Sequence, residues 1–96
     1  MAVYIVAEQE IIDPEGYREY QRRVVPTILQ YGGKVLAAGK PVAIIEGNWH
    51  PKRVLILEFE SLEQVNRWYN SEEYTAIKDI RLKSALTQGV VVQGLQ

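Results

Sequence analysis

The fold is decided by the stretch Trp49-His50-Pro51-Lys52-Arg53-Val54-Leu55-Ile56-Leu57-Glu58-Phe59. Its branched and aromatic side chains suit a pleated, buried surface, and Pro51 marks the entry to the strand. Side chains alternate between the two faces of a strand. One face therefore carries Arg53, Leu55, Leu57 and Phe59, and the other carries Val54, Ile56 and Glu58. Because both faces are apolar in the middle, we predict a central strand that is covered on both sides.

The chain before this stretch predicts a strand followed by a helix. Residues 2–10 form the strand, with Val3, Ile5 and Ala7 on its core face, while Tyr4, Val6, Glu8 and Glu10 lie opposite. Asp13-Pro14 starts the helix, since Asp caps free amides and Pro is favoured at the first helical position. Its apolar stripe is Tyr17, Tyr20, Val24, Ile28 and Tyr31, and Gly32-Gly33 ends it. Pro26 predicts a kink near Arg22 and Arg23.

Four more segments complete the pattern. Lys34–Ala38 is a second strand, Gly39-Lys40-Pro41 interrupts it and Val42–Glu46 resumes, which fits either one bulged strand or two strands of a hairpin. Ser61-Leu62-Glu63-Gln64 is a capping box that starts a helix, and Ser71 restarts that helix with a new cap. Val90-Val91-Val92 is the last strand. The order strand, helix, strand, strand, helix, strand is typical of the α+β ferredoxin-like fold, an antiparallel sheet with two helices on one face.

Composition limits the classes of protein and partner. At 96 residues the chain is expected to be one domain spanning residues 1–96. A net charge of −1 favours neither nucleic acid nor an anionic membrane as a partner. The sequence has no cysteine and no metal-binding motif, so we expect a cytoplasmic protein without a cofactor. The second sheet face is apolar but has no helix to cover it, which predicts a homodimer that pairs sheet against sheet.

Several motifs together resemble a known family. They are Asp13-Pro14 with Tyr17 and Tyr20, Tyr31-Gly32-Gly33, Glu46-Gly47 with Trp49, Pro51 and Arg53, Glu58-Phe59, Trp68-Tyr69 with Ser71 and Tyr74, and Arg81. This set resembles the small bacterial proteins grouped as domain of unknown function 1330. The resemblance implies a ferredoxin-like subunit of the dimeric α+β barrel superfamily, which also contains cofactor-free monooxygenases, muconolactone isomerases and haem-degrading enzymes. The family has no agreed reaction, so the resemblance supplies no catalytic residues.

Glu58 is the first candidate for chemistry. A carboxylate on a covered strand face is costly unless it is paired. Glu58 is therefore either an acid or base of adjustable pKa, or the structural partner of an arginine such as Arg81. In the functional interpretation Arg53 or Arg81 holds an anionic group of the ligand. Arg53 and Glu58 point to opposite faces of a regular strand, so a direct pair between them needs a bulge.

The other candidate site residues each have both a functional and a purely structural interpretation. Tyr4 and Glu8 share a face with Glu58 and would line either a ligand pocket between two paired sheets or a water-filled dimer interface. Trp68 and Tyr74 would form either an aromatic wall of the site or part of the core. His50 is the only histidine, so it is a candidate for proton transfer or haem binding, with an exposed loop residue as the alternative.

Two functions follow from these candidates, and the sequence leaves open whether the protein is an enzyme. The first is that the protein binds a small organic molecule, with an anion as one option, and converts it without a cofactor. In this case Glu58 is the acid or base. The second is a non-catalytic binding or structural homodimer, in which the same charges only stabilise the fold.

Overall fold

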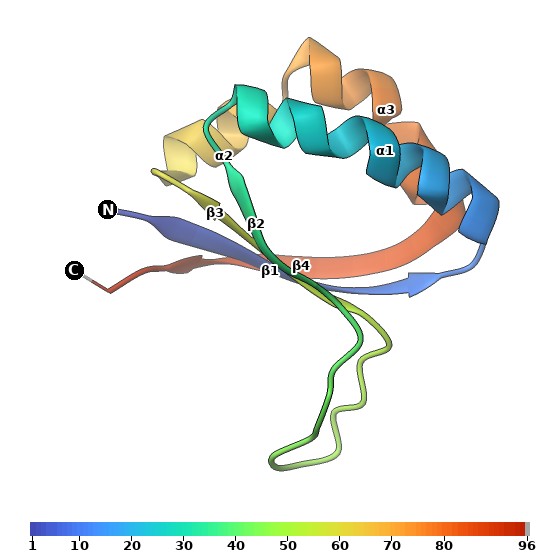
Figure 1. The fold of residues 1–96 in the computed structure, drawn as a ribbon. Helices are drawn as coiled ribbons and strands as arrows, with labels where there is room; N and C mark the ends of the chain where they lie inside the picture. The colour runs from blue at the N-terminus through green and yellow to red at the C-terminus, as the bar shows by residue number, and fades with distance from the viewer. Residues whose placement is uncertain (96) are drawn as a thin grey trace.

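The computed structural model describes residues 1–95. Within them the elements follow in the order β1 (Val3–Ile11), α1 (Pro14–Gln30), β2 (Lys34–Gly39), β3 (Val54–Phe59), α2 (Leu62–Tyr69), α3 (Glu72–Ser84) and β4 (Ala85–Gln93). The strands form one antiparallel sheet in the order β2-β3-β1-β4, and the helices lie over one face of it (Figure 1). The predicted ferredoxin-like α+β fold is confirmed, with β3 in the interior of the sheet. The second predicted helix is divided into α2 and α3.

The helix ends follow the local chemistry of the sequence. The carboxylate of Asp13 accepts a hydrogen bond of 3.2 Å from the Gly16 amide at the start of α1. Gly32 ends the helix with a φ of 80°, which lets the Gly33 amide donate to the Ile28 carbonyl at 2.8 Å. Ser71 caps α3 by accepting from the Tyr74 amide at 3.0 Å. These caps agree with the prediction.

The capping box before α2 is only half formed. Ser61 accepts from the Gln64 amide at 3.1 Å, as predicted. The Gln64 side chain does not return to Ser61 but donates to the Tyr31 carbonyl at 2.7 Å. Because Tyr31 follows α1 directly, this bond connects the start of α2 to the end of α1.

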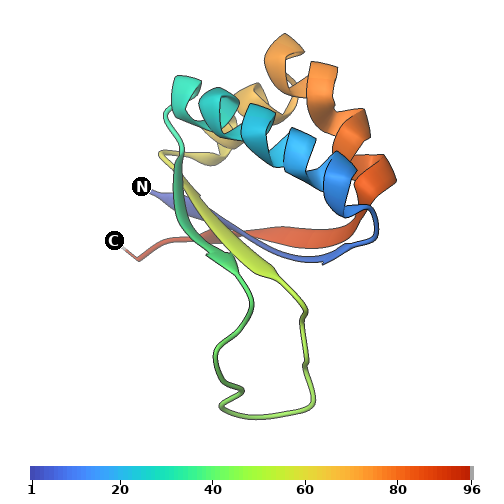
Figure 2. The same ribbon diagram turned by 45° about the vertical axis from the view of Figure 1, so that its right-hand side comes forward.

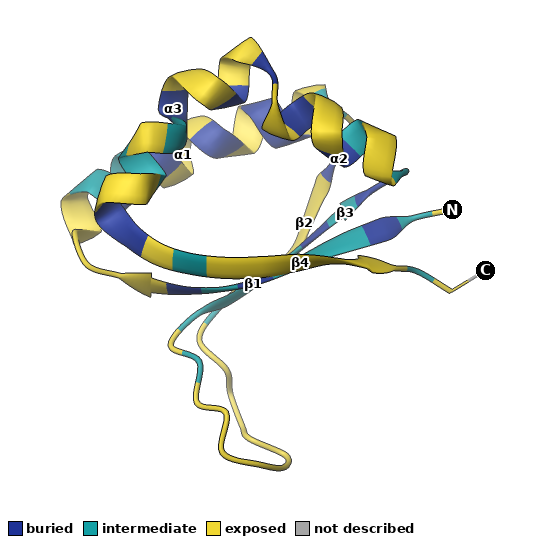
Figure 3. Ribbon diagram, turned by 180° about the vertical axis from the view of Figure 1, so that it is seen from behind, coloured by how far each residue is buried: buried dark blue, intermediate teal, exposed yellow. Residues whose placement is uncertain are grey.

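Strand register places the core between the sheet and the helices. Ile5 pairs with Leu57 and Ala7 with Leu55, so the odd-numbered residues of β1 and β3 share the helix-covered face. Leu57 and Phe59 are buried there in one hydrophobic cluster with residues of α1, α2 and α3. Figure 3 shows buried stretches on β3 and on the helices in dark blue. The predicted division of these two strands into faces is confirmed. The other face, which we call the open face, carries Tyr4, Val6, Glu8, Val54, Ile56 and Glu58.

The segment between β2 and β3 differs from the prediction. Residues 40–53, which we call the projecting loop, form no strand, and the loop extends away from the helices before it returns to the sheet at its end (Figures 1 and 2). Neither alternative for Val42–Glu46 is therefore right, and β3 begins only at Val54. The bulge lies earlier, between Val35 and Ala37 of β2. The physical reason is that Val42 and Ile45 have no element to pack on and remain 103% and 99% exposed.

No helix among residues 1–95 has the length and apolar character that crossing a membrane requires.

Candidate functional site

A cavity of about 650 Å³ lies between the sheet and the helices. Its walls are mostly apolar, with Ile5 and Leu55 from the sheet, Val24 from α1 and Val65 from α2. The polar and charged lining residues are Gln9, Tyr17, Tyr20, Gln21, Arg53, Asn66, Tyr69, Tyr74, Arg81 and Thr87. Within the described chain the lining contains no Asp, Glu or His side chain. The cavity is therefore an apolar space bordered by two cations and no anion.

Two tyrosines and one arginine meet on one side of this cavity, in what we call the tyrosine–arginine cluster. Tyr74 and Arg81 are seven residues apart on α3, so both lie on the same side of the helix. The Arg81 Nε–H donates to the Tyr74 hydroxyl at 3.0 Å, and the Tyr74 and Tyr20 hydroxyls are 2.9 Å apart. Burial, followed by the neighbouring Tyr74, raises the pKa of Tyr20 far above its usual value. Tyr20 therefore remains a neutral phenol at physiological pH.

Arg53 supplies the second cation just before β3. Its carbonyl accepts a hydrogen bond of 2.9 Å from the Gln9 amide, which fixes the backbone against β1. The guanidinium carbon lies 5.4 Å from the centre of the Tyr17 ring, within the range of a cation–π contact. The Nε–H is buried and has no acceptor among residues 1–95. A buried N–H donor without an acceptor lowers the stability of the folded protein by about 1–3 kcal/mol, and the loss is larger when the donor belongs to a charged group.

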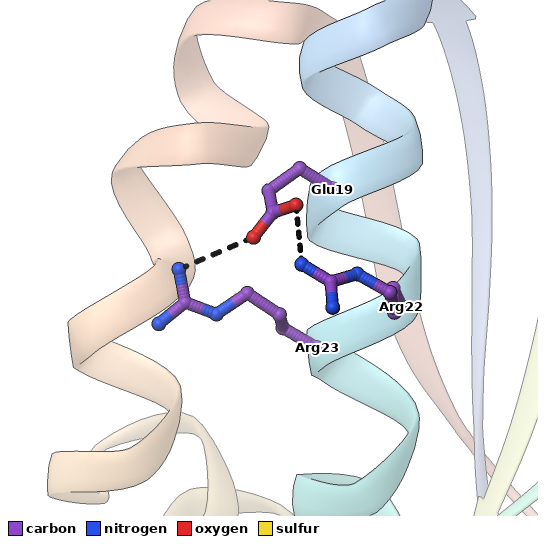
Figure 4. Close-up of polar contacts among 3 residues, drawn as sticks. All are labelled: Glu19, Arg22 and Arg23. Carbon is purple, nitrogen blue, oxygen red and sulfur yellow. Dashed lines mark hydrogen bonds and ion pairs between the residues drawn. The ribbon is translucent and has the colours of Figure 1, made fainter.

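Within residues 1–95, two arginines on the outer surface of α1 are paired with a carboxylate, unlike Arg53 and Arg81 at the cavity. Arg22 lies 2.6 Å and Arg23 3.6 Å from the Glu19 carboxylate (Figure 4). The hydrogen bond from Arg22 lowers the pKa of Glu19 below its usual value. These exposed pairs contribute little to stability because water screens them. The exposed arginines Arg22 and Arg23 thus have a carboxylate partner. Arg53 and Arg81, at the cavity, have none in the part of the chain that the structure describes.

Most other buried polar groups around the cavity have partners inside the protein. The Tyr17 hydroxyl donates to Gln9 Oε1, and Gln9 Nε2 donates to Thr87 Oγ1 at 3.4 Å. Trp68 Nε1 donates to Thr27 Oγ1 at 3.0 Å. These groups position the cavity walls, whereas the buried Arg53 Nε has no hydrogen-bond partner among residues 1–95.

The structure divides the sequence-predicted site residues between the two faces of the sheet. Arg53, Trp68, Tyr74 and Arg81 come together at the cavity. Tyr4, Glu8 and Glu58 lie on the open face and do not line it. The expected site that combines Glu58 with the aromatic wall and Arg81 is therefore wrong in geometry, because a sheet separates these groups. A pocket of Tyr4, Glu8 and Glu58 against a partner sheet stays a prediction.

Glu58 has local partners other than Arg81. The Tyr4 hydroxyl donates to Glu58 Oε2 at 3.1 Å, and Lys34 Nζ is 4.0 Å from Oε1. The hydrogen bond to this carboxylate raises the pKa of Tyr4. The proposed structural pair of Glu58 with Arg81 is corrected by these contacts. Nearby, the Glu8 carboxylate accepts from Gln88 at 3.1 Å and from the Trp49 indole at 3.4 Å.

His50 lies in the projecting loop, is exposed and does not line the cavity. The structure therefore places it where the plainer of the two interpretations expected it, as an exposed loop residue. Among residues 1–95 there is also no group of three or more His, Cys, Asp or Glu side chains placed to hold a metal ion.

Sequence reasoning missed Tyr17, Tyr20 and Gln9 as lining residues. Tyr17 and Tyr20 were assigned to the apolar stripe of the first helix and to the family motifs, and not to the site. A stripe that contains two tyrosines carries a signal, because a buried phenol usually finds a hydrogen-bond partner. Gln9 lies two residues after Ala7 in the series Val3, Ile5 and Ala7. Because alternate residues of a strand share a face, its side-chain amide is expected on the core face. Both signals indicate a polar feature inside the core.

Solved structures with this fold come from several kinds of protein. A protein of unknown function from Rhodopseudomonas palustris superposes with a TM-score of 0.82 at 18% identity, over 99% of this chain and 83% of that chain. SnoaB, a cofactor-independent oxygenase from Streptomyces nogalater, gives a TM-score of 0.72 at 10% identity, over 99% and 94%. An uncharacterized NIPSNAP domain protein from Burkholderia xenovorans gives 0.67 at 14% identity, over 99% and 95%. Identities this low establish the shared fold alone.

No curated protein sequence matches the chain significantly. A family model does match it, and its description is a domain of unknown function, DUF1330. The match covers residues 2–95, nearly the whole sequence, and the family is the one that the sequence motifs resembled. The chain therefore belongs to the DUF1330 family.

Proposed function

We propose that the protein binds a small organic anion with a largely apolar body in the cavity between the helices and the sheet. The observation that carries this proposal is Arg53, whose buried Nε–H has no acceptor within residues 1–95. A guanidinium beside an apolar cavity loses hydration without gaining a counter-ion, which is unfavourable for the protein alone. A carboxylate or a similar anion in the cavity removes this cost and accepts the planar fork of N–H donors.

The dimensions and lining of the cavity support the same class of ligand. A volume of about 650 Å³ is in the range of small-molecule sites. Trp68, Tyr17 and Leu57 offer flat or apolar contact surface. Arg81 adds a second cation, so the electrostatic preference for an anion does not depend on Arg53 alone.

Binding is proposed ahead of turnover because of the acids and bases available. No carboxylate or imidazole of the described chain lines the cavity, and the buried phenol of Tyr20 keeps its proton. Glu58, the base expected from the sequence, lies on the open face. Conversion of the bound molecule without a cofactor, as in the oxygenase that shares the fold, is the second candidate. Oxygen uptake that depends on the bound molecule would distinguish turnover from binding.

The test of binding uses a pair of probes with the same shape and different charge. We expect 2-naphthoate to bind at least ten times more tightly than the neutral 2-naphthamide, measured by isothermal titration calorimetry. The tenfold ratio corresponds to about 1.4 kcal/mol, which is modest for a charge-assisted hydrogen bond in a partly desolvated site. Equal affinities for the two probes, or no binding of either, would contradict the proposal.

The proposal extends to a homodimer that pairs the open faces of two subunits. This face carries Val6 and Ile56, and Val90 and Val92 of β4 extend the same apolar surface. Val90 and Val92 are 60% and 47% exposed in one subunit. A contiguous apolar sheet face of this kind is typical of an interface. An isologous pairing of two copies covers it on both subunits at once.

The dimer has a direct test in solution. Val92→Lys places a charge on the open face, so we expect the dimer dissociation constant to rise at least tenfold in sedimentation velocity. Leu29→Lys, at an exposed leucine on α1, is the matched control and should leave association unchanged. A wild-type protein that is monomeric at micromolar concentration would contradict the dimer.

A further inference from the structure

One hydroxyl proton of the tyrosine–arginine cluster has no acceptor within the cluster. Tyr20 and Tyr74 each have one hydroxyl proton, and only one proton can lie between their two oxygens. The Arg81 Nε–H is already directed at the Tyr74 oxygen. If Tyr20 donates to Tyr74, the Tyr74 proton is left over. If Tyr74 donates to Tyr20, the Tyr20 proton is left over instead.

The proton that is left over belongs to a buried group in either arrangement. Tyr20 is 6% and Tyr74 2% exposed, and both line the cavity. The hydrogen bonds of residues 1–95 include no further acceptor for either hydroxyl. This distinguishes the pair from Tyr17, whose hydroxyl donates to Gln9. A buried hydroxyl donor is expected to have an acceptor, so the cavity side of the cluster is the place for one.

The cluster offers more donors than acceptors to the cavity, because Arg81 only donates and each phenol brings a proton as well as oxygen lone pairs. Arg81 has four further N–H groups besides Nε–H and cannot accept a hydrogen bond. The spare phenol proton and these N–H groups can bond to one acceptor in the cavity, whose lining among residues 1–95 contains no carboxylate. Such an arrangement favours an oxygen atom with negative charge over the same oxygen carrying a proton, because the guanidinium charge attracts the anion and its hydrogen bonds to these donors are stronger.

From this geometry we propose that Tyr20, Tyr74 and Arg81 form an oxyanion site that binds the ionised oxygen of a weakly acidic ligand, a phenol or an enol. The inference rests on the proposed function, since the ligand occupies the same cavity, and it narrows the ligand class. Binding then takes place with loss of the ligand's O–H proton to the solvent. The ligand's oxygen accepts the spare phenol proton as a hydrogen bond and lies beside the Arg81 guanidinium.

The experiment uses 4-nitrophenol, because its phenol and phenolate forms absorb at different wavelengths. We expect the pKa of the bound probe to lie at least one unit below its value in buffer, which means at least tenfold tighter binding of the phenolate. Calorimetry in two buffers of different ionisation enthalpy should show proton release below the pKa of the free probe. Tyr20→Phe and Tyr74→Phe each remove a hydroxyl and should reduce the pKa shift by more than half.

Tyr69→Phe is the matched control. Tyr69 lines the same cavity, but its hydroxyl makes no hydrogen bond to Tyr20, Tyr74 or Arg81, so its variant should keep most of the shift. Thermal unfolding of each variant identifies any that has lost its fold. If one of the two phenylalanine variants does not fold, the other still provides the test.

The possible outcomes separate this inference from the proposed function. Binding of 4-nitrophenol with an unshifted pKa, or a shift that survives both phenylalanine substitutions, overturns the oxyanion site while leaving anion binding intact. Binding of 2-naphthoate without any binding of 4-nitrophenol also counts against the inference. If neither probe binds, the proposed function itself fails.

Discussion

Trp68→Ala is expected to lower the free energy of unfolding by about 3–5 kcal/mol, the usual loss when a buried tryptophan is truncated. The indole is only 4% exposed. Its ring centre lies 5.4 Å from that of Phe59 and 4.4 Å from that of Tyr74. The substitution therefore removes contacts with the sheet and with α3 together. It also removes the hydrogen bond from Nε1 to Thr27 of α1, so the layer that covers the cavity loses its central contact.

The chain provides a matched control in its second tryptophan. Trp49 is 59% exposed in the projecting loop, and among residues 1–95 its hydrogen bonding is limited to the long contact of 3.4 Å to Glu8. We expect Trp49→Ala to change the free energy of unfolding by less than about 0.5 kcal/mol, as most surface substitutions do. Urea denaturation followed by circular dichroism measures both variants. A small loss in Trp68→Ala would mean that Trp68 serves as a wall for the ligand and not as part of the core.

The elements of this fold could be read from the sequence because their signals are local. Alternation along β1 and β3 assigned Val3, Ile5 and Leu57 to the face that the helices cover. Asp13 and Gly32 marked the two ends of α1, since capping and a positive φ depend on neighbouring residues alone. The order of such elements is enough to select the ferredoxin-like topology.

The projecting loop could not be predicted because its sequence resembles a strand. Val42 and Ile45 have strong strand propensity, but propensity only describes how a side chain fits a half-buried, pleated surface. No neighbouring strand is available to residues 40–53 in one subunit, so they remain irregular and exposed. This is a case in which tertiary context decides against a local preference.

The site was only partly predictable for a related reason. Arg53 and Arg81 were recognised as candidate anion-binding residues from their types and positions, and the structure brings both to one cavity. Glu58 was assigned to the same chemistry because a charge on a strand is conspicuous in sequence. Which layer lies over each face of the sheet cannot be read from one strand. The sheet itself lies between Glu58 and the two arginines. The side chain of Tyr4 is the actual partner of Glu58.

Arg53→Met is expected to reduce the affinity for 2-naphthoate by about 30–150-fold, which corresponds to about 2–3 kcal/mol. Methionine keeps most of the volume of the arginine stem but removes the charge and the N–H donors. The free energy of unfolding should stay the same or rise, since the substitution also removes a buried N–H that has no acceptor within residues 1–95. Loss of affinity without loss of stability is the signature of a ligand-binding charge.

The same substitution at a surface arginine isolates the effect of position. Arg22 has a side chain that is 73% exposed and is paired with Glu19, so Arg22→Met changes the net charge equally but leaves the cavity intact. We expect its affinity for 2-naphthoate to stay within twofold of the wild type in calorimetry at 0.15 M salt, where distant charges are largely screened. If Arg53→Met instead lowers stability and leaves affinity unchanged, Arg53 is a structural residue that stacks on Tyr17. In that case the anion would have to be bound through Arg81 alone, and Arg81→Met would show the loss of affinity in its place.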